Sequence, residues 1–150
     1  MSELRELYQE VILDHNRNPR NFRIMEHPTA SVEGYNPLCG DHYTVYLRRE
    51  GDRIADGSFQ GAGCAISKAS ASVMSQLLKG KTKAEAEKIF ETFHTLVTGK
   101  REDMGSIEEV GRLAAFAGVR EFPARVKCAS LAWHTLKAAL EGESKNVTTE

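Results

Sequence analysis

The sequence predicts a single α+β domain in which a small antiparallel sheet of about three strands packs against several helices. Between residues 31 and 60, apolar side chains alternate with more polar ones, as in half-buried strands. Beyond that segment they recur at helical spacing, and no strand–helix–strand alternation typical of a parallel sheet is present. A chain of 150 residues can bury a core without disulfide bonds. We therefore expect residues 1–150 to form one domain.

The composition excludes several classes of protein. The chain has 20 Lys and Arg against 21 Asp and Glu, a net charge of −1, which lacks the basic surplus of nucleic-acid-binding or polybasic membrane-surface proteins. No apolar run approaches the roughly 20 residues that span a bilayer, and the charged N-terminus does not resemble a signal peptide. Three cysteines are too few and odd in number for a disulfide framework. We predict a cytoplasmic protein with reduced thiols and no nucleic-acid or membrane partner.

The first expected element is a helix that ends at Asn18-Pro19, because proline cannot continue a helix. Its apolar residues repeat every three or four positions, at Leu4, Leu7, Tyr8, Val11 and Ile12. After an irregular stretch, a short strand is expected at Ser31–Tyr35.

Two longer strands are expected to follow as a hairpin. Tyr43, Val45 and Leu47 alternate with more polar side chains, the period of a strand with one buried face. Glu50-Gly51-Asp52 has the length of a hairpin link, and Arg53–Gln60 continues as the partner strand. The pair predicts an antiparallel hairpin.

Two helices are expected after Gly61-Ala62-Gly63. In the first, small and apolar residues recur at helical spacing from Ile66 to Leu77, and Cys64 lies at its N-terminus. The second opens with the capping box Thr82-Lys83-Ala84-Glu85. Its expected buried face comprises Ala86, Ile89, Phe90, Phe93, Leu96 and Val97.

Two more helices complete the expected fold. A second capping box, Ser106-Ile107-Glu108-Glu109, precedes apolar residues up to Ala117. Pro123 suits the first turn of the last helix. The inner face of that helix is expected to comprise Cys128, Leu131, Ala132, Thr135, Leu136 and Ala139. The polar residues from Glu141 onward are expected to fray.

The three cysteines, Cys39, Cys64 and Cys128, each lie at a junction between expected elements, where distant segments can converge. Asp41 stands two residues after the first of them. Three thiolates and one carboxylate would complete a four-coordinate zinc site, although the spacing is unlike that of a zinc finger. Taken singly, each cysteine is better interpreted as a small buried side chain.

Other chemistries fit the residues less well. No C-x-x-C pair is present for dithiol redox chemistry. Gly61-Ala62-Gly63 lies at a strand-to-helix turn, as a dinucleotide fingerprint does, but Ile66 occupies the third glycine position and no Walker lysine follows. A Cys/His nucleophilic pair stays open. The candidate histidines are His15, His27, His42, His94 and His134.

These motifs resemble those of the U-type iron–sulfur cluster assembly proteins, the family of IscU, SufU and the N-terminal domain of NifU. Three cysteine motifs in this order and at these separations are a specific match. The segments that carry the resemblance are Tyr8 to His15, Asn18-Pro19-Arg20-Asn21, Asn36-Pro37-Leu38-Cys39-Gly40-Asp41, Gly61 to Ser67 and Arg125-Val126-Lys127-Cys128. The resemblance implies that Cys39, Asp41, Cys64 and Cys128 bind a metal ion or cluster.

Within the family, the chain resembles the SufU branch, because an additional segment of about Thr98 to Glu121 precedes the last cysteine. Lys127 stands where IscU-type members have histidine. The resemblance implies a zinc-containing protein that accepts persulfide sulfur from a PLP-dependent cysteine desulfurase similar to SufS. It would deliver that sulfur to downstream iron–sulfur assembly proteins, and whether this makes it a zinc-dependent sulfurtransferase in the enzymatic sense stays open.

The resemblance also implies roles for single residues. Cys39 would leave the zinc and accept the sulfur. Charge counting, independently of the resemblance, suggests that Arg125 and Lys127 next to Cys128 offset the negative charge of such a site. Two alternatives remain open at this point. The same four ligands would suit a scaffold that carries a transient [2Fe–2S] cluster, or a structural zinc-binding module without turnover.

Overall fold

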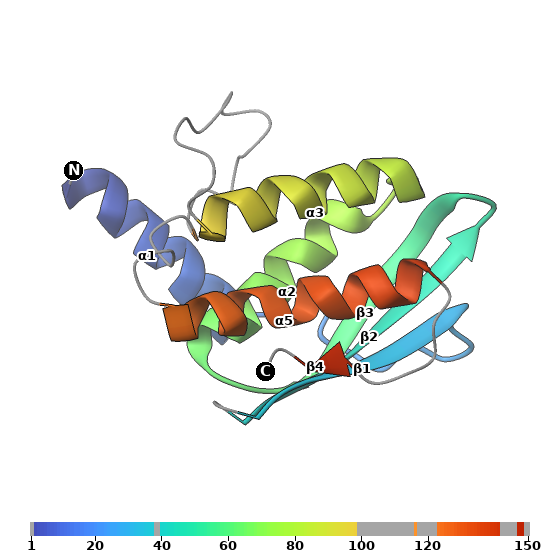
Figure 1. The fold of residues 1–150 in the computed structure, drawn as a ribbon, viewed down its shortest axis with the longest axis horizontal. Helices are drawn as coiled ribbons and strands as arrows, with labels where there is room; N and C mark the ends of the chain where they lie inside the picture. Colours follow the sequence, from blue (N-terminus) through green and yellow to red (C-terminus); the bar gives the residue numbers. More distant parts are fainter. Residues whose placement is uncertain (1, 38–39, 99–115, 117–122, 142–146, 149–150) are drawn as a thin grey trace.

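The structure is a computed structural model that describes residues 2–37, 40–98, 116, 123–141 and 147–148. Figure 1 shows helices and strands in two layers. The elements are α1 (Ser2–Arg17), β1 (Ala30–Asn36), β2 (Asp41–Glu50), β3 (Arg53–Ala62), α2 (Ala65–Leu78), α3 (Lys83–Thr98), α5 (Pro123–Leu140) and β4 (Val147–Thr148). The predicted α+β class is confirmed.

The sheet has the strand order β3-β2-β1-β4. The pairs β1–β2 and β2–β3 are antiparallel, as the sequence predicts. β4 is an addition, because it pairs in parallel with β1 at Gly34 and Tyr35. The prediction of a wholly frayed polar tail is therefore wrong at Val147–Thr148, where the open edge of β1 offers backbone groups to pair with.

The hairpin follows the period-two pattern that predicts it. Tyr43, Val45 and Leu47 are buried on the helix-covered face of the sheet. The register shifts between Arg48 and Arg49, and this irregularity lets Ile54 of β3 join the core as well.

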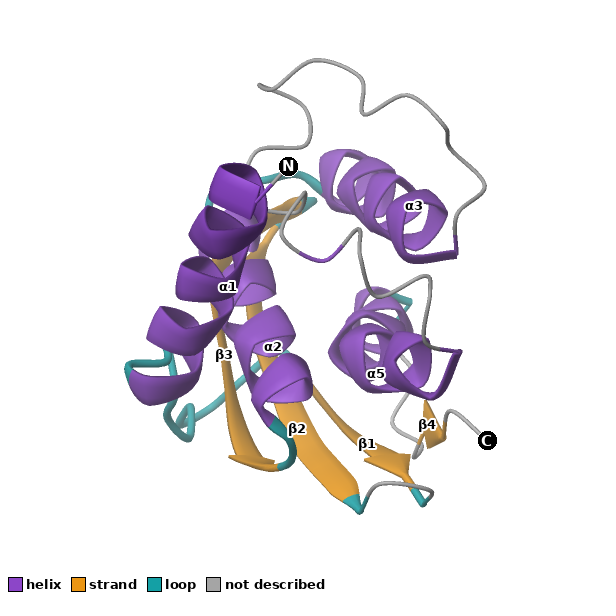
Figure 2. Cartoon of the chain, turned by 90° about the vertical axis from the view of Figure 1, so that its left-hand side faces the viewer, coloured by secondary structure: helices purple, strands orange, loops and turns teal. Residues whose placement is uncertain are grey.

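The helices in the described part of the chain lie on the same side of the sheet (Figure 2). α2 and α5 contact the strands directly, α1 packs on α2, and α3 packs on α5. The expected inner face of α5 is buried, but so are Ala129, Trp133 and Leu140. The burial is wider than predicted because α5 lies between the sheet, α2 and α3.

Serine side chains of α2 join this helix to its neighbours. Ser70 Oγ donates to the carbonyl oxygen of Ala129 at 2.6 Å and accepts from Trp133 Nε1 at 2.9 Å. Ser72 Oγ lies 2.7 Å from Nδ1 of His15. Small side chains let the helices approach closely while these hydrogen bonds satisfy the buried polar groups. The N-terminus of α2 is thereby held next to the first turns of α5.

The first capping box is confirmed, because the backbone N–H of Thr82 donates to Glu85 Oε1 at 2.9 Å and that of Glu85 to Thr82 Oγ1 at 3.2 Å. The helix predicted at 106–117 lies outside the described residues except for Phe116, whose ring packs on Phe93. Among the described helices, none has the length and hydropathy to cross a membrane.

Candidate metal centre

Three predicted site residues converge although they lie far apart in the sequence. Asp41 is the first residue of β2, Cys64 immediately precedes α2, and Cys128 lies near the N-terminal end of α5. One carboxylate oxygen and the two sulfur atoms all lie within 4.8 Å of one another. We call these three residues the Asp–Cys–Cys cluster.

Asp41 is fully buried, yet only one of its carboxylate oxygens has a hydrogen-bond partner in the described part of the chain. Oδ1 accepts from the backbone N–H of Cys64 at 2.9 Å, whereas Oδ2 is unpartnered. Burying a carboxylate without compensation is costly, so this arrangement favours a bound cation. The other two members of the cluster are cysteine thiols, side chains that can bind such a cation as thiolates.

Cys64 caps the N-terminus of α2. Its backbone is extended, and its Sγ accepts from the N–H of Ser67 at 3.5 Å. The positive end of the helix dipole stabilises negative charge at this position. The thiol is only half-buried, so the cluster has an accessible side.

Glycine is needed at positions 61 and 63 because other segments of the chain lie very close to them. A Cβ on Gly63 would lie 2.6 Å from Asp41 Oδ1 and 2.7 Å from the Tyr43 hydroxyl. At Gly61, where φ is 143°, a Cβ would lie 2.1 Å from the carbonyl oxygen of His42. Without side chains, these glycines let β3 and the start of α2 lie close to β2.

Cys128 is buried, and its place follows from how α5 sits on β1. A Cβ on Gly34 would lie 2.0 Å from Thr135 Oγ1, so glycine lets the helix lie directly on the strand. At the end of the same strand, Nδ2 of the buried Asn36 lies 3.7 Å from Cys128 Sγ. The helix–strand contact therefore sets both the position of the thiol and its hydrogen-bond partner.

Tyr43 supports the cluster from the core side. Its hydroxyl lies 3.1 Å from Ser67 Oγ. Burial, with the nearby Asp41, Cys64 and Cys128, raises the pKa of Tyr43 well above its usual value, against the lowering effect of its hydrogen bond with Ser67. The hydroxyl therefore stays protonated and available as a hydrogen-bond donor.

The remaining predicted residues are placed differently. Cys39 lies outside the described residues, but its neighbour Gly40 donates to the carbonyl oxygen of Asn36 at 2.8 Å. The chain on both sides of 38–39 is thus held beside Asp41, which pairs with Asn36 across the β1–β2 ladder. Arg125 is exposed and Lys127 is half-buried on the first turns of α5.

The histidines do not join the Asp–Cys–Cys cluster within the described part of the chain. His15 bonds to Ser72, and His42 lies on the open face of the sheet. His94 and His134 face each other between α3 and α5. The contacts described for these four histidines are with groups other than Cys64 and Cys128.

Three residues that support the cluster have no role in the site predicted from the sequence. They are Asn36, Tyr43 and Ser67. Asn36 stands in the same sequence motif as Cys39. Ser67 follows Cys64 by three positions, the spacing between an N-cap residue and the backbone N–H that bonds to its side chain. The donor set of two thiols and a carboxylate with a free lone pair fits a divalent ion such as zinc.

Comparisons with known proteins identify the family of the chain. The family model described as "NifU-like N terminal domain" matches residues 7–129. The zinc-dependent sulfurtransferase SufU of Bacillus subtilis is 41% identical over 91% of this chain and 91% of its own length. The iron–sulfur cluster assembly scaffold protein IscU of Streptococcus pyogenes is 37% identical over 94% of this chain and 87% of its own.

Solved structures share the fold. One is the crystal structure of FiSufU from the thermophile Fervidobacterium islandicum, named as an iron–sulfur cluster assembly scaffold protein for a SUF system. It has a TM-score of 0.81 at 38% identity. The match covers 87% of this chain and 94% of that one. The chain therefore belongs to the NifU-like N-terminal domain family, together with the IscU and SufU proteins.

Proposed function

We propose that the chain holds one zinc ion with Cys39, Asp41, Cys64 and Cys128 and accepts persulfide sulfur for iron–sulfur cluster assembly. The observation that carries the proposal is the buried, unpartnered Oδ2 of Asp41 beside two thiols. The name of the Bacillus relative, a zinc-dependent sulfurtransferase, supports this role. The sulfur donor is a PLP-dependent cysteine desulfurase similar to SufS, and the PLP belongs to that partner. The cytoplasmic location and the domain bounds 1–150 stay predictions.

Zinc at this site would keep the thiols deprotonated and cancel half of the ligands' negative charge. Two net negative charges remain on three thiolates, one carboxylate and the ion. Arg125 and Lys127 lie on the turns of α5 next to Cys128 and offset part of this charge. They give electrostatic support and attract an anionic persulfide.

Cys39 is the proposed acceptor. Its thiolate attacks the terminal sulfur of the partner's persulfide, the sulfur–sulfur bond there breaks, and the electron pair returns to the partner's cysteine. Cys39 then carries the persulfide, and no oxidant or reductant is consumed. Gly40, which has φ 74°, gives the adjoining backbone a conformation that other residues rarely adopt. Cys64 and Cys128 remain as ligands, and downstream iron–sulfur assembly proteins receive the sulfur.

Metal analysis and sulfur transfer test this proposal together. Purified protein is expected to contain about one zinc per chain and to accelerate sulfur release from cysteine by the desulfurase. Non-reducing mass spectrometry after that reaction is expected to find the added sulfur on Cys39. Sulfur on Cys128, with Cys39→Ser still accepting it, would overturn the assignment. Zinc without any stimulation of the desulfurase would indicate a structural zinc module instead.

A scaffold for a transient [2Fe–2S] cluster is the second candidate, because relatives such as the Streptococcus protein are named IscU scaffolds. The same four residues would hold the cluster. Anaerobic reconstitution with iron and sulfide separates the two roles. A chromophore that persists and passes to an apo-acceptor, in a protein that does not stimulate the desulfurase, would favour the scaffold.

A further inference from the structure

We propose that Asn36 and Ser67 are positioning residues that keep Cys128 and Cys64 on the metal as retained thiolate ligands. Each sulfur has its own hydrogen-bond donor from a different element, β1 for one and α2 for the other. The inference rests on the proposed function, because it assumes a metal ion at the Asp–Cys–Cys cluster.

Asn36 is placed to act on one sulfur. It is fully buried at the last position of β1, its Nδ2 lies 3.7 Å from Cys128 Sγ, and its backbone pairs with Asp41. A metal-bound thiolate has no proton to donate, so an N–H group is the partner it requires. The backbone oxygen of Asn36 accepts a hydrogen bond from the Gly40 N–H. This bond helps to hold Asn36 in place at the end of β1.

Ser67 acts on the other sulfur. Its backbone N–H donates to Cys64 Sγ at 3.5 Å, and its Oγ lies 3.7 Å from the same atom. The Tyr43 hydroxyl, 3.1 Å from that Oγ, fixes the serine side chain from the core side. Cys64 is therefore held by a chain of contacts that ends inside the hydrophobic core.

Hydrogen bonds to a thiolate stabilise its negative charge and lower its readiness to attack an electrophile. Residues outside the ligand set also fix the direction in which a ligand points. Cys64 and Cys128 thus become poor nucleophiles that stay in place. Exchange is then left to the third thiol of the proposed site, Cys39.

Cobalt(II) binding gives a readout that a purely structural role would not move. Asn36→Ala removes the donor, and Asn36→Asp keeps the size but turns an oxygen toward the sulfur. Both are expected to shift the thiolate-to-cobalt charge-transfer band to lower energy and to weaken zinc binding about 10- to 100-fold. Alkylation of Cys128, followed by mass spectrometry, is expected to become faster in both variants.

Ser70→Ala is the matched control, because Ser70 is equally buried and its hydroxyl bonds to Ala129 and Trp133 of α5 rather than to a sulfur. It is expected to lower stability while the band and the zinc affinity stay unchanged. Ser67→Ala provides a second variant should the Asn36 variants not fold. It keeps the backbone donor to Cys64 Sγ but loses the hydroxyl contacts with Tyr43, with Cys64 Sγ and with the Cys64 carbonyl oxygen, so a smaller shift in the same direction is expected.

The outcomes separate this inference from the function on which it rests. Asn36 variants that fold and keep the wild-type band and affinity would overturn the inference while the zinc site stands. A Ser67→Ala band identical to that of wild type would overturn its second half. A wild-type protein that binds cobalt without any thiolate band would overturn the proposed function as well.

Discussion

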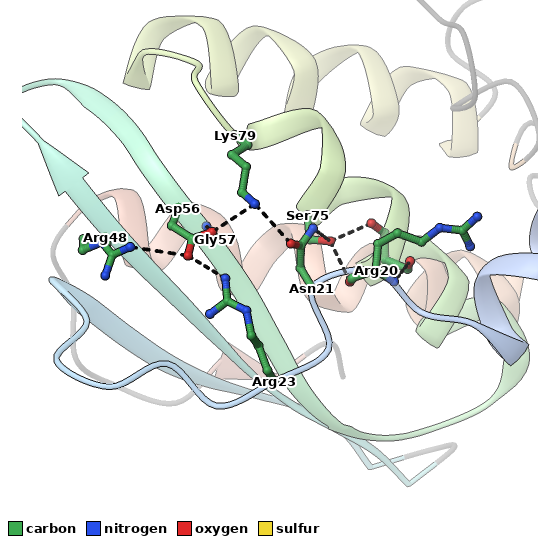
Figure 3. A network of polar contacts seen from close by, with 9 residues as sticks. Arg20, Asn21, Arg23, Arg48, Asp56, Gly57, Ser75 and Lys79 are labelled. Carbon is green, nitrogen blue, oxygen red and sulfur yellow. Dashed lines mark hydrogen bonds and ion pairs between the residues drawn. The ribbon is translucent and has the colours of Figure 1, made fainter.

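Two buried aspartates lie at opposite ends of the β2–β3 hairpin, and the protein treats them differently. Asp56 of β3, 9% exposed, is surrounded by cations. Its carboxylate lies 2.5 Å from Arg23, 3.4 Å from Lys79 and 3.6 Å from Arg48 (Figure 3). Asp41, 0% exposed, has instead one backbone N–H and two thiols around it.

The difference supports a structural role for Asp56 and the proposed metal-binding role for Asp41. At Asp56 the chain supplies its own positive charge, together with the backbone N–H of Gly57 at 2.9 Å. At Asp41, Oδ2 has no partner in the part of the chain that the structure describes. A buried charge needs compensation, so the missing partner at Asp41 supports the proposed metal ion.

Zinc removal should give the largest change in stability. The substitution Asp41→Asn should destabilise the zinc-bound protein but not the metal-free one. At a free zinc concentration about 1,000 times Kd, binding stabilises wild type by about 4 kcal/mol. Asp41→Asn is expected to lose most of that gain. Without metal, the variant is expected to be at least as stable as metal-free wild type, since an unpaired charge is gone. Thermal unfolding with zinc and with chelator measures both.

Asp56→Asn is the matched control for this metal-dependent change in stability. It should leave the zinc-dependent gain intact and lower stability with and without metal. If instead Asp41→Asn destabilises the metal-free protein as Asp56→Asn does, Asp41 is compensated by the chain and the comparison fails.

The glycines next to the two aspartates sharpen the comparison. Gly63→Ala places a Cβ 2.6 Å from Asp41 Oδ1, so a loss of about 1–3 kcal/mol and weaker zinc binding are expected. Gly57→Ala, beside Asp56, meets its nearest atom, in the side chain of Leu47, at 3.5 Å, an ordinary contact. It should change neither zinc affinity nor stability appreciably. Equal zinc titrations of the two variants would argue against a site at Asp41.

Acid should weaken the Asp56 end in a defined direction. Burial opposes ionisation of Asp56, but the hydrogen bond from Arg23 and the charges of Arg23 and Lys79 outweigh it and lower its pKa below 3.8. A carboxylate with a depressed folded-state pKa contributes stability above the unfolded-state pKa and loses it as pH falls through the folded-state value. The stability gap between wild type and Asp56→Asn, about 1–2 kcal/mol near neutral pH, should therefore close below about pH 4. Urea unfolding from pH 7 to pH 3 measures the gap, and a constant gap would contradict the assignment.

Lys79→Ala should have the smallest effect. Lys79 is half-exposed, and Arg23 and Arg48 remain to compensate Asp56. A loss of about 0–1 kcal/mol is expected, as for other solvent-exposed ion pairs. A change in bound zinc on this substitution would show that the two ends of the hairpin are coupled.

Local patterns in the sequence predicted most of the fold. The alternation at Tyr43, Val45 and Leu47 marks a strand with one buried face, and the Thr82–Glu85 box marks a helix start. These features depend on residues a few positions apart, so no knowledge of the rest of the chain is needed. The breadth of burial on α5 was missed, because neighbours on three sides determine it.

The candidate site was likewise only partly predictable from the sequence. Its residue types, Asp41, Cys64 and Cys128, were identifiable from motifs and from the resemblance those motifs carry. The role of Asn36 was not, because an asparagine before a turn is ordinary until Cys128 is found 3.7 Å away.

The sequence by itself determined which segments become strands and helices and which side chains offer metal-binding chemistry, because both follow from residue type and short-range spacing. Only the tertiary structure decided which carboxylate is compensated and which is not. Motifs single out Asp41 as a candidate ligand, but nothing in the local sequence shows that Asp56 is surrounded by cations and that Asp41 is not. The arrangement of Arg23, Arg48 and Lys79 around one of them, and of two thiols around the other, exists only when segments distant along the chain are packed together.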